Sequence, residues 1–198
     1  MEKEAEEFLE KRGFKIVDRI YIRKKSGISK AINKIGFPFV MKVSGEKIIH
    51  KNKVGGIKTN IKNYKHALKA FMEIKKIKNF EGCMIQKQIT GKEFLLGIKK
   101  TPEFEHVVAF GAGGIHTEKL KDVSFRVCPF DKNEARKMIK EIKSAKRLNK
   151  KNIDDIEKNL IKLSYLAKKY PKIKELDINP LMVDKKRAII VDARIVLE

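Results

Sequence analysis

The chain has 198 residues, 42% of them hydrophobic and 36% charged, and its 47 basic and 25 acidic residues give a formal net charge of +22 at pH 7. This length and apolar content exclude a disordered tail and suit one compact domain or two closely joined subdomains. No apolar run approaches the roughly 20 residues of a membrane helix, and the charged start MEKEAEEFLEKRG lacks the hydrophobic segment of a signal peptide, so we expect no membrane partner.

The first 80 residues are expected to contain three helices and two strands. Amphipathic periodicity and capping residues place the helices at 2–11, 26–35 and 63–77. Alternating apolar and polar residues place the strands at 38–44 and 56–61. The Gly- and Lys-rich residues between them, 45–56, are expected to form a loop.

The remainder of the chain is expected to begin with strands and to continue with helices. Four β-patterned runs read CMIQKQI, EFLLGIKK, EHVVAFG and DVSFRVC. A capping box of Asp131 and Glu134 opens a helix at 132–144, and Asn152 or Asp154 opens a long helix that ends near Tyr170. A strand, a proline turn and a hairpin around 184–186 complete the chain. This order indicates an α+β fold rather than an alternating parallel sheet.

The basic residues are spread along the whole chain rather than gathered in one segment. Trp is absent and aromatic residues make up 8%, without the aromatic and basic alternation that stacks nucleic-acid bases. A lysine-rich surface, or a small polyanion such as ATP or coenzyme A, is therefore favoured over a nucleic-acid partner. Cys83 and Cys128 are isolated in apolar runs, which indicates two buried thiols in a reducing cytoplasm rather than a disulfide or a zinc site.

The segment FVMKVS and the loop after it hold the first candidate site residues. Lys42 lies inside an apolar strand, so it is expected either to face a cleft that binds an anion or to lie on a solvent-exposed face. Gly55 and Gly56 would let backbone N–H groups approach a phosphate, although two glycines before a strand also form ordinary turns. His50 precedes this basic loop. It is either a phosphoryl acceptor or a surface histidine at a strand end.

The second half of the chain offers candidate oxygen ligands. Asn179 follows a β-patterned run, and Asp192 lies in the expected strand IIVDARI. An amide and a carboxylate oxygen from neighbouring strands suit Mg²⁺ that also holds phosphate oxygens; alternatively, Asp192 pairs with Arg194 or a lysine. The stretch FGAGGIHTEKLKDVSFR combines a glycine turn with the acidic residue Glu118, a combination that is not specific by itself.

The order of these parts resembles that of ATP-grasp domains, and three segments resemble one family of them. GFPFVMKVSGEKIIHKNKVGGIKTNI, GGIHTEKLKDVSFRVCPF, and ELDINPLMV followed by VDARIVL are similar to segments of ADP-forming acyl-CoA synthetases. The resemblance covers essentially the whole chain. It implies an ATP-grasp fold, in which two α+β subdomains, 1–80 and 81–198, clasp a nucleotide. It also implies the β subunit, or detached ATP-grasp domain, of an ADP-forming acetate–CoA ligase, with Mg²⁺ and ATP or ADP as cofactors.

The resemblance also implies the partner and the site residues. The partner is a CoA-binding α subunit in an α2β2 assembly, located in the cytoplasm. His50 takes a phosphoryl group and passes it to or from ADP, and the Mg²⁺ ligands are Asn179 and Asp192. The nucleotide contacts are Lys42, Gly55, Gly56, the adenine hinge of Gln86, Lys87, Gln88 and Ile89, and Glu118. The chain departs from the family at Asn52-Lys53, where Ser-Asp is usual, at Lys87, where Glu is frequent, and at His116-Thr117, where an apolar pair is common.

Three alternatives remain at this point. A succinate–CoA ligase β subunit shares the architecture, but the segment IIHKNKVGG disfavours it. An ATP-grasp ligase that makes an acyl phosphate for an amine would not need His50. A noncatalytic basic module that binds nucleic acid would need neither Lys42 nor the pair of Asn179 and Asp192.

Overall fold

The computed structural model describes residues 2–48, 51–114 and 122–198, and the chain divides into two compact units. The middle unit comprises residues 17–89, and the terminal unit comprises residues 1–16 together with 90–198. This division differs from the expected boundary between residues 80 and 81. Helix α1 (Glu2–Glu10) belongs to the terminal unit, and strand β4 (Gly82–Lys87) belongs to the middle unit.

Packing and pairing explain why the division differs. Ala5 and Leu9 of α1 are buried in the hydrophobic core of the terminal unit, and the Ile190 N–H donates to the Lys15 carbonyl at 3.0 Å. Strand β4 pairs with both β1 (Arg19–Ile22) and β2 (Phe39–Ser44), so it lies at the centre of the other sheet. The packing of α1 and the pairing of β4 both join residues that are far apart in the sequence.

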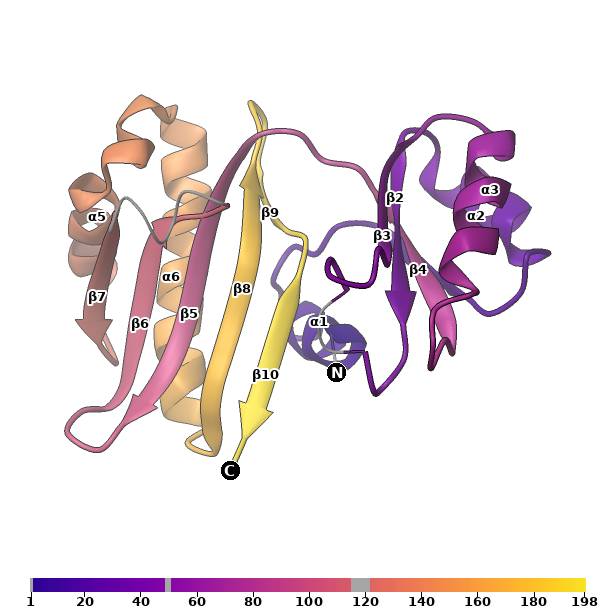
Figure 1. Ribbon diagram of the computed structural model, residues 1–198. Helices are drawn as coiled ribbons and strands as arrows, with labels where there is room; N and C mark the ends of the chain where they lie inside the picture. Colours follow the sequence, from indigo (N-terminus) through magenta and orange to yellow (C-terminus); the bar gives the residue numbers. More distant parts are fainter. Residues whose placement is uncertain (1, 49–50, 115–121) are drawn as a thin grey trace. The chain divides into compact units, whose positions relative to one another are not determined.

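The middle unit is a four-stranded antiparallel sheet with two helices on one face (Figure 1). The strand order is β1-β4-β2-β3, with β3 at Ile57–Ile61, and the helices are α2 (Gly27–Ile35) and α3 (Tyr64–Ile74). Helix α3 begins where the Asn63 carboxamide oxygen accepts the His66 N–H at 2.9 Å, as the sequence predicted. The alternate residues Phe39, Met41 and Val43 are fully buried in the core that also holds α2 and α3.

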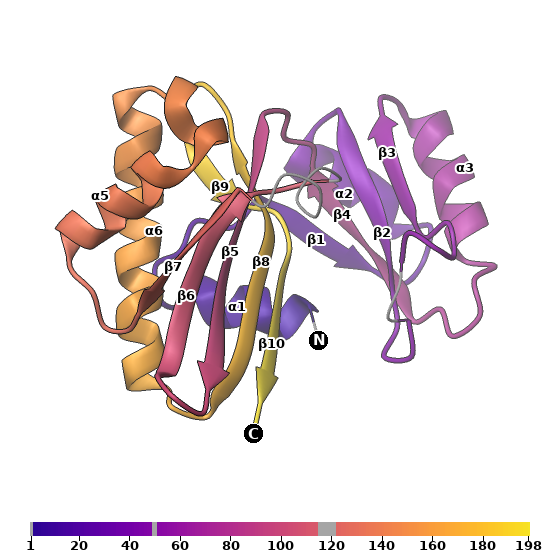
Figure 2. The same ribbon diagram turned by 60° about the vertical axis from the view of Figure 1, so that its left-hand side comes forward.

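The terminal unit is built on a larger antiparallel sheet, with helices α5 and α6 covering one face (Figures 1 and 2). The strand order is β10-β8-β5-β6-β7, and β9 pairs with β8. The strands are β5 (Lys92–Thr101), β6 (Glu105–Ala112), β7 (Val123–Val127), β8 (Ile173–Val183), β9 (Ala188–Ile190) and β10 (Ala193–Leu197). The helices are α5 (Lys132–Glu141), the short 3-10 helix η1 (Lys143–Arg147) and α6 (Lys150–Lys169).

The expected α+β organisation agrees with these elements, but three local predictions need correction. Strand β1 was not predicted, because it is four residues long and pairs with β4 alone. Helix α6 is capped by Asn149, which accepts the Asn152 N–H at 2.9 Å, rather than by Asn152 or Asp154. Asp192 lies between β9 and β10 rather than inside one continuous strand. In the part of the chain that the structure describes, we find no helix both long and apolar enough to cross a bilayer.

Candidate functional site

Lys42 lies on the face of the middle sheet opposite to helices α2 and α3. Its neighbours Met41 and Val43 point into the helix-covered core, so the alternation of the strand turns Lys42 the other way. It pairs in register with Ile57 of β3 and Met84 of β4, and only 5% of its surface is exposed. Lys42 is therefore not a solvated surface lysine, which excludes the second of the two expectations, and the anion-binding cleft stays a prediction.

Gly55 and Gly56 bring the end of the loop against β2, beside Lys42. The Val43 N–H donates to the Gly56 carbonyl at 2.7 Å. A Cβ atom on Gly56 would lie 2.3 Å from Val43 Cγ1, and Gly55 has a φ of +67°, so both positions require glycine. The Gly56 and Gly55 N–H groups donate to the Lys51 and Asn52 carbonyls at 2.8 and 3.1 Å. In this conformation they close the turn and do not present donors to a phosphate, which differs from the expectation.

The expected adenine hinge, Gln86 to Ile89, begins in β4 and ends at the last residue of the middle unit. The Lys87 N–H donates to the Asp18 carbonyl at 2.9 Å, and the Gln88 N–H donates to the Pro38 carbonyl at 3.3 Å. Two of the hinge amides are thus already hydrogen-bonded within the unit. A backbone donor to a purine would have to come from elsewhere in the segment, such as Ile89.

Asn179 and Asp192 lie side by side in the terminal unit. The Asn179 N–H donates to the Asp192 carbonyl at 3.1 Å, next to a bond of the same length from the Val191 N–H to the Pro180 carbonyl. Asn179 is exposed and Asp192 is half-buried. The structure therefore brings together the two residues that the sequence proposed as Mg²⁺ ligands, although they come from β8 and from the break between β9 and β10.

A second carboxylate, Asp177, was missed from the sequence. It lies two residues before Asn179 on the same face of β8, opposite Arg194 of β10 and Gly97 of β5, which adds no side chain there. Partial desolvation and the nearby carboxylates of Glu175 and Asp192 raise the pKa of Asp177, and Arg194 opposes them. The sequence LDIN could have indicated Asp177, because it lies two residues before Asn179 and alternate residues of a strand share a face.

These residues suit a cation whose coordination shell is completed by a bound ligand. Among residues 2–48, 51–114 and 122–198, no three His, Cys, Asp or Glu side chains converge into a metal-binding cluster. Mg²⁺ commonly takes only one or two carboxylates and fills its octahedral shell with waters and phosphate oxygens. The oxygens of Asn179 and Asp192 therefore fit Mg²⁺ that arrives with a nucleotide better than a preformed all-protein metal site. His50 and Glu118 lie outside the described residues.

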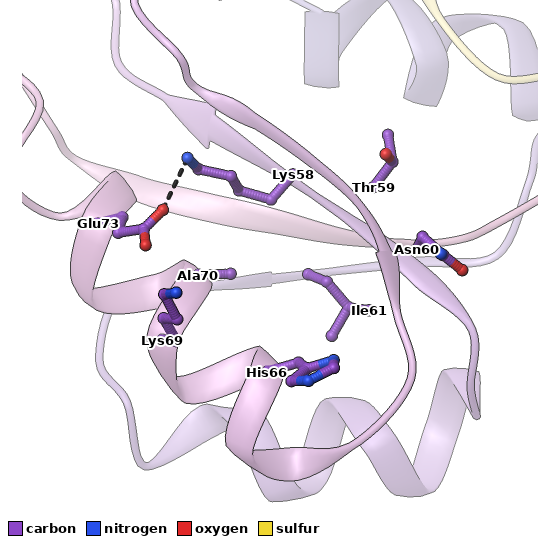
Figure 3. Close-up of a pocket in the computed structure, with 8 residues that line it drawn as sticks. All are labelled: Lys58, Thr59, Asn60, Ile61, His66, Lys69, Ala70 and Glu73. Atoms are coloured by element: carbon purple, nitrogen blue, oxygen red, sulfur yellow. Dashed lines mark ion pairs between the residues drawn. The ribbon is translucent and has the colours of Figure 1, made fainter.

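A pocket of about 280 Å³ between β3 and α3 is lined by none of the predicted site residues (Figure 3). An ion pair neutralises the charge of Lys58 at this pocket, because Lys58 Nζ lies 2.7 Å from Glu73 Oε2. This ion pair lowers the pKa of Glu73. The side chains of Thr59 and Asn60 point away from α3. The polar groups around this pocket do not converge on a common point, so we do not assign the nucleotide to it.

Comparison with known proteins identifies the family. A family model described as an ATP-grasp domain matches residues 1–197. The chain belongs to the ATP-grasp family. It is 38% identical to the β subunit of acetate–CoA ligase (ADP-forming) I of Pyrococcus furiosus, and the match covers 100% of this chain and 91% of that subunit. It is 36% identical to acetate–CoA ligase (ADP-forming) II of Archaeoglobus fulgidus, but spans 30% of that longer protein.

Solved structures agree with this ATP-grasp assignment. Dinucleotide-forming acetyl-coenzyme A synthetase 1 of Candidatus Korarchaeum cryptofilum, with coenzyme A and Ca-AMPCP, aligns with a TM-score of 0.91 and 32% identity, covering 100% of this chain and 92% of that one. Another structure of that enzyme, with coenzyme A and Mg-AMPPCP, has a TM-score of 0.87, 33% identity and the same coverage, and its phosphohistidine segment points towards the nucleotide site. The ATP-grasp fold predicted from the sequence is confirmed.

Proposed function

We propose that this chain is the nucleotide-binding β subunit of an ADP-forming acyl-CoA ligase. The observation that carries the proposal is the match to an acetate–CoA ligase β subunit over 91% of its length, whereas the chain spans 30% of the longer acetate–CoA ligase (ADP-forming) II. The reaction converts acyl-CoA, ADP and phosphate into the carboxylate, CoA and ATP. The same match supports this interpretation over a succinate–CoA ligase, another ATP-grasp ligase or a nucleic-acid-binding module.

Each of the two units holds described residues that suit a part of the nucleotide. Lys42, buried in β2, supplies a fixed positive charge for the phosphates. Asn179 and Asp192 would hold Mg²⁺, which supplies charge neutralisation on the phosphate oxygens. The carboxylate of Asp177 adds negative potential beside them. The hinge of Gln86 to Ile89 would border the base.

The transferred phosphoryl group passes through His50. In the direction of ATP synthesis, an oxygen of the ADP β-phosphate attacks the phosphorus on the imidazole. The N–P bond breaks and the new P–O bond forms. The released imidazole nitrogen takes up one proton, which leaves a neutral imidazole. Glu118 would contact the nucleotide. These two roles rest on the sequence resemblance alone.

A separate CoA-binding α subunit would carry out the acyl chemistry, in an α2β2 assembly. The relatives include both β subunits and longer proteins, which supports a split between the two activities. Two free cysteines among the described residues suit a reducing cytoplasm, where we place the enzyme.

A phosphorylation experiment tests the proposal. The chain is mixed with its α subunit and γ-labelled ATP, and the label is located by peptide mapping. We expect an acid-labile, alkali-stable label on His50, because a phosphoramidate has this stability. His50→Ala should retain Mg·ATP binding through Lys42 and Asp192 but lose net turnover.

His66→Ala is the matched control, since His66 is exposed on α3 and only its backbone N–H is used, in the helix cap. This variant should be labelled and turn over as the wild type does. If His50→Ala keeps wild-type turnover, the phosphohistidine step is wrong and the chain is an ATP-grasp enzyme of another kind.

A further inference from the structure

Two consecutive side chains at the end of β4, Lys87 and Gln88, turn back into the middle unit. Lys87 Nζ donates to the Phe37 carbonyl at 3.0 Å. Gln88 Oε1 accepts the backbone N–H of Asn60 at 2.7 Å, the shorter of the two bonds. Both residues belong to the hinge expected to border the base. Their functional groups are bound to the protein's own backbone.

The backbone groups that they hold lie where β2 and β3 depart from regular pairing. Phe37 precedes Pro38, immediately before β2. In β3 the register shifts, because Phe39 pairs with Ile61 but Met41 pairs with Lys58. Two residues of β3 therefore oppose one residue of β2, as in a β-bulge. Asn60 lies in this bulge with a φ of +56°, and Gln88 satisfies its N–H.

These bonds connect the hinge to both β2 and β3. Lys42 lies on β2, and Gly55-Gly56 lead into β3. The bond from the Gln88 N–H to the Pro38 carbonyl at 3.3 Å is a third attachment of the hinge, and the second to the start of β2. A shift of the hinge relative to Lys42 would have to break these bonds.

We propose that Lys87 and Gln88 are positioning residues, which fix the hinge at a set spacing from Lys42 and do not themselves contact the nucleotide. This inference rests on the proposed function, because it assumes that the hinge borders the base and that Lys42 meets the phosphates. Its consequence is specific. Loss of either bond should weaken ligands that occupy both ends of the site, and should spare a ligand that occupies the phosphate end alone.

The test compares two ligands by calorimetric titration of the full chain, Mg·ATP and Mg·tripolyphosphate, which lacks a base and a ribose. Gln88→Leu removes the acceptor at similar volume, and Lys87→Met removes the donor but keeps the apolar stem. Each is expected to weaken Mg·ATP by about fivefold, the scale of one net hydrogen bond. The affinity for Mg·tripolyphosphate should stay within about twofold of the wild type, a change smaller than one net hydrogen bond, because this ligand occupies the phosphate end alone.

Two further variants make the result decisive. Gln88→Glu keeps an oxygen acceptor at the same position and should restore most of the Mg·ATP affinity, which a general loss of stability would not allow. Lys65→Met removes an exposed lysine of α3 and should bind both ligands as the wild type does. The positioning role is overturned if the Leu and Met variants bind Mg·ATP normally. It is also overturned if they lose both ligands equally, which indicates a structural role only.

A failure of the proposed function gives a different pattern. Lys42→Met should weaken both Mg·ATP and Mg·tripolyphosphate, because it removes the buried charge that meets the phosphates. If Lys42→Met binds both ligands as the wild type does, then the nucleotide site itself is misplaced. The positioning role of Lys87 and Gln88 fails with it.

Discussion

Asp177 is an exposed residue of β8, but the groups around it disfavour its negative charge. Partial desolvation and the carboxylates of Glu175 and Asp192 raise its pKa, with Arg194 acting in the opposite direction. A raised pKa means that the folded state binds the proton more tightly than the unfolded state, so ionised Asp177 costs stability above that pKa. Such a cost is typical of binding sites, where a ligand later removes it.

Asp177→Asn should therefore raise the melting temperature of the ligand-free chain at pH 7. The gain should shrink as the pH falls through the raised pKa, because the wild-type side chain then becomes neutral as well. Calorimetry at pH 7 and at about pH 3.5, below the ordinary Asp pKa, measures both values. Glu103→Gln, an exposed carboxylate in the β5–β6 turn, is the control and should show no gain. A lower melting temperature for Asp177→Asn at pH 7 would contradict this account.

The sequence indicated individual candidate residues better than the contacts between them. Lys42 and the pair of Asn179 and Asp192 were selected because polar groups in apolar strands need partners, and the structure places the pair side by side. The bonds that occupy the Gly55 and Gly56 N–H groups could not be read from the sequence, because loop closure depends on which carbonyls the fold brings near. Strand alternation places Asp177 on the same face as Asn179, so the sequence alone was sufficient to indicate it.

At the level of elements, the edge strand β7 is fastened to helix α5 by an ionic cluster. Arg126 Nε lies 2.7 Å from Glu134 Oε2, and Arg126 Nη2 lies 2.6 Å from Glu141 Oε1. Ser124 Oγ also donates to Glu141 Oε2 at 2.5 Å. The hydrogen bonds from Arg126 and Ser124 lower the pKa of Glu141. Arg126 Nη1 also donates to Glu141 Oε2 at 3.3 Å, so the contact with Glu141 is bidentate and stronger than an isolated surface ion pair.

Arg126→Met should lower the melting temperature at pH 7 by about 2–4 °C, the shift that 1 kcal/mol produces in a chain of this size. Because the folded pKa of Glu141 lies below its unfolded value, the contribution is present above about pH 4.5 and is lost as the pH falls through the lower folded pKa. The difference between variant and wild type should therefore vanish in acid. Lys137→Met removes an exposed partner of Glu134 and should have a smaller effect. An equal difference at all pH values would rule out the ionic explanation.

Helices with clear caps were predicted closely, and elements fixed by distant partners were not. The caps of α3 and α5 lie at Asn63 and Asp131, where the sequence placed them. Strand β1 escaped prediction because four residues carry little periodicity and its pairing partner is β4, more than 60 residues away. The same reason explains the boundary between the units, since the contacts of α1 with the terminal unit are long-range.

The net charge of +22 belongs to the whole molecule and is compatible with two kinds of ligand. A general basic surface attracts any polyanion and is screened by salt. A nucleotide site instead needs specific groups, for which we propose Lys42, Asn179 and Asp192, and it depends on Mg²⁺. Melting of the full chain in the presence of each ligand separates the two, because a ligand that binds only the folded state stabilises it in proportion to its affinity.

Mg·ATP should stabilise the chain by roughly 2.7 kcal/mol at a concentration of about 100 times Kd, and the gain should persist at 0.3 M salt. Asp192→Asn should reduce the Mg²⁺-dependent part of this gain and leave the effect of Mg²⁺-free ATP unchanged, because it removes an anionic oxygen ligand and preserves the shape. Scanning calorimetry with ATP, Mg·ATP and a single-stranded oligonucleotide measures each gain. If the oligonucleotide stabilises the chain and Mg·ATP does not, the charge serves nucleic-acid binding and the nucleotide site is wrong. If Asp192→Asn responds to Mg²⁺ as the wild type does, the metal is held elsewhere.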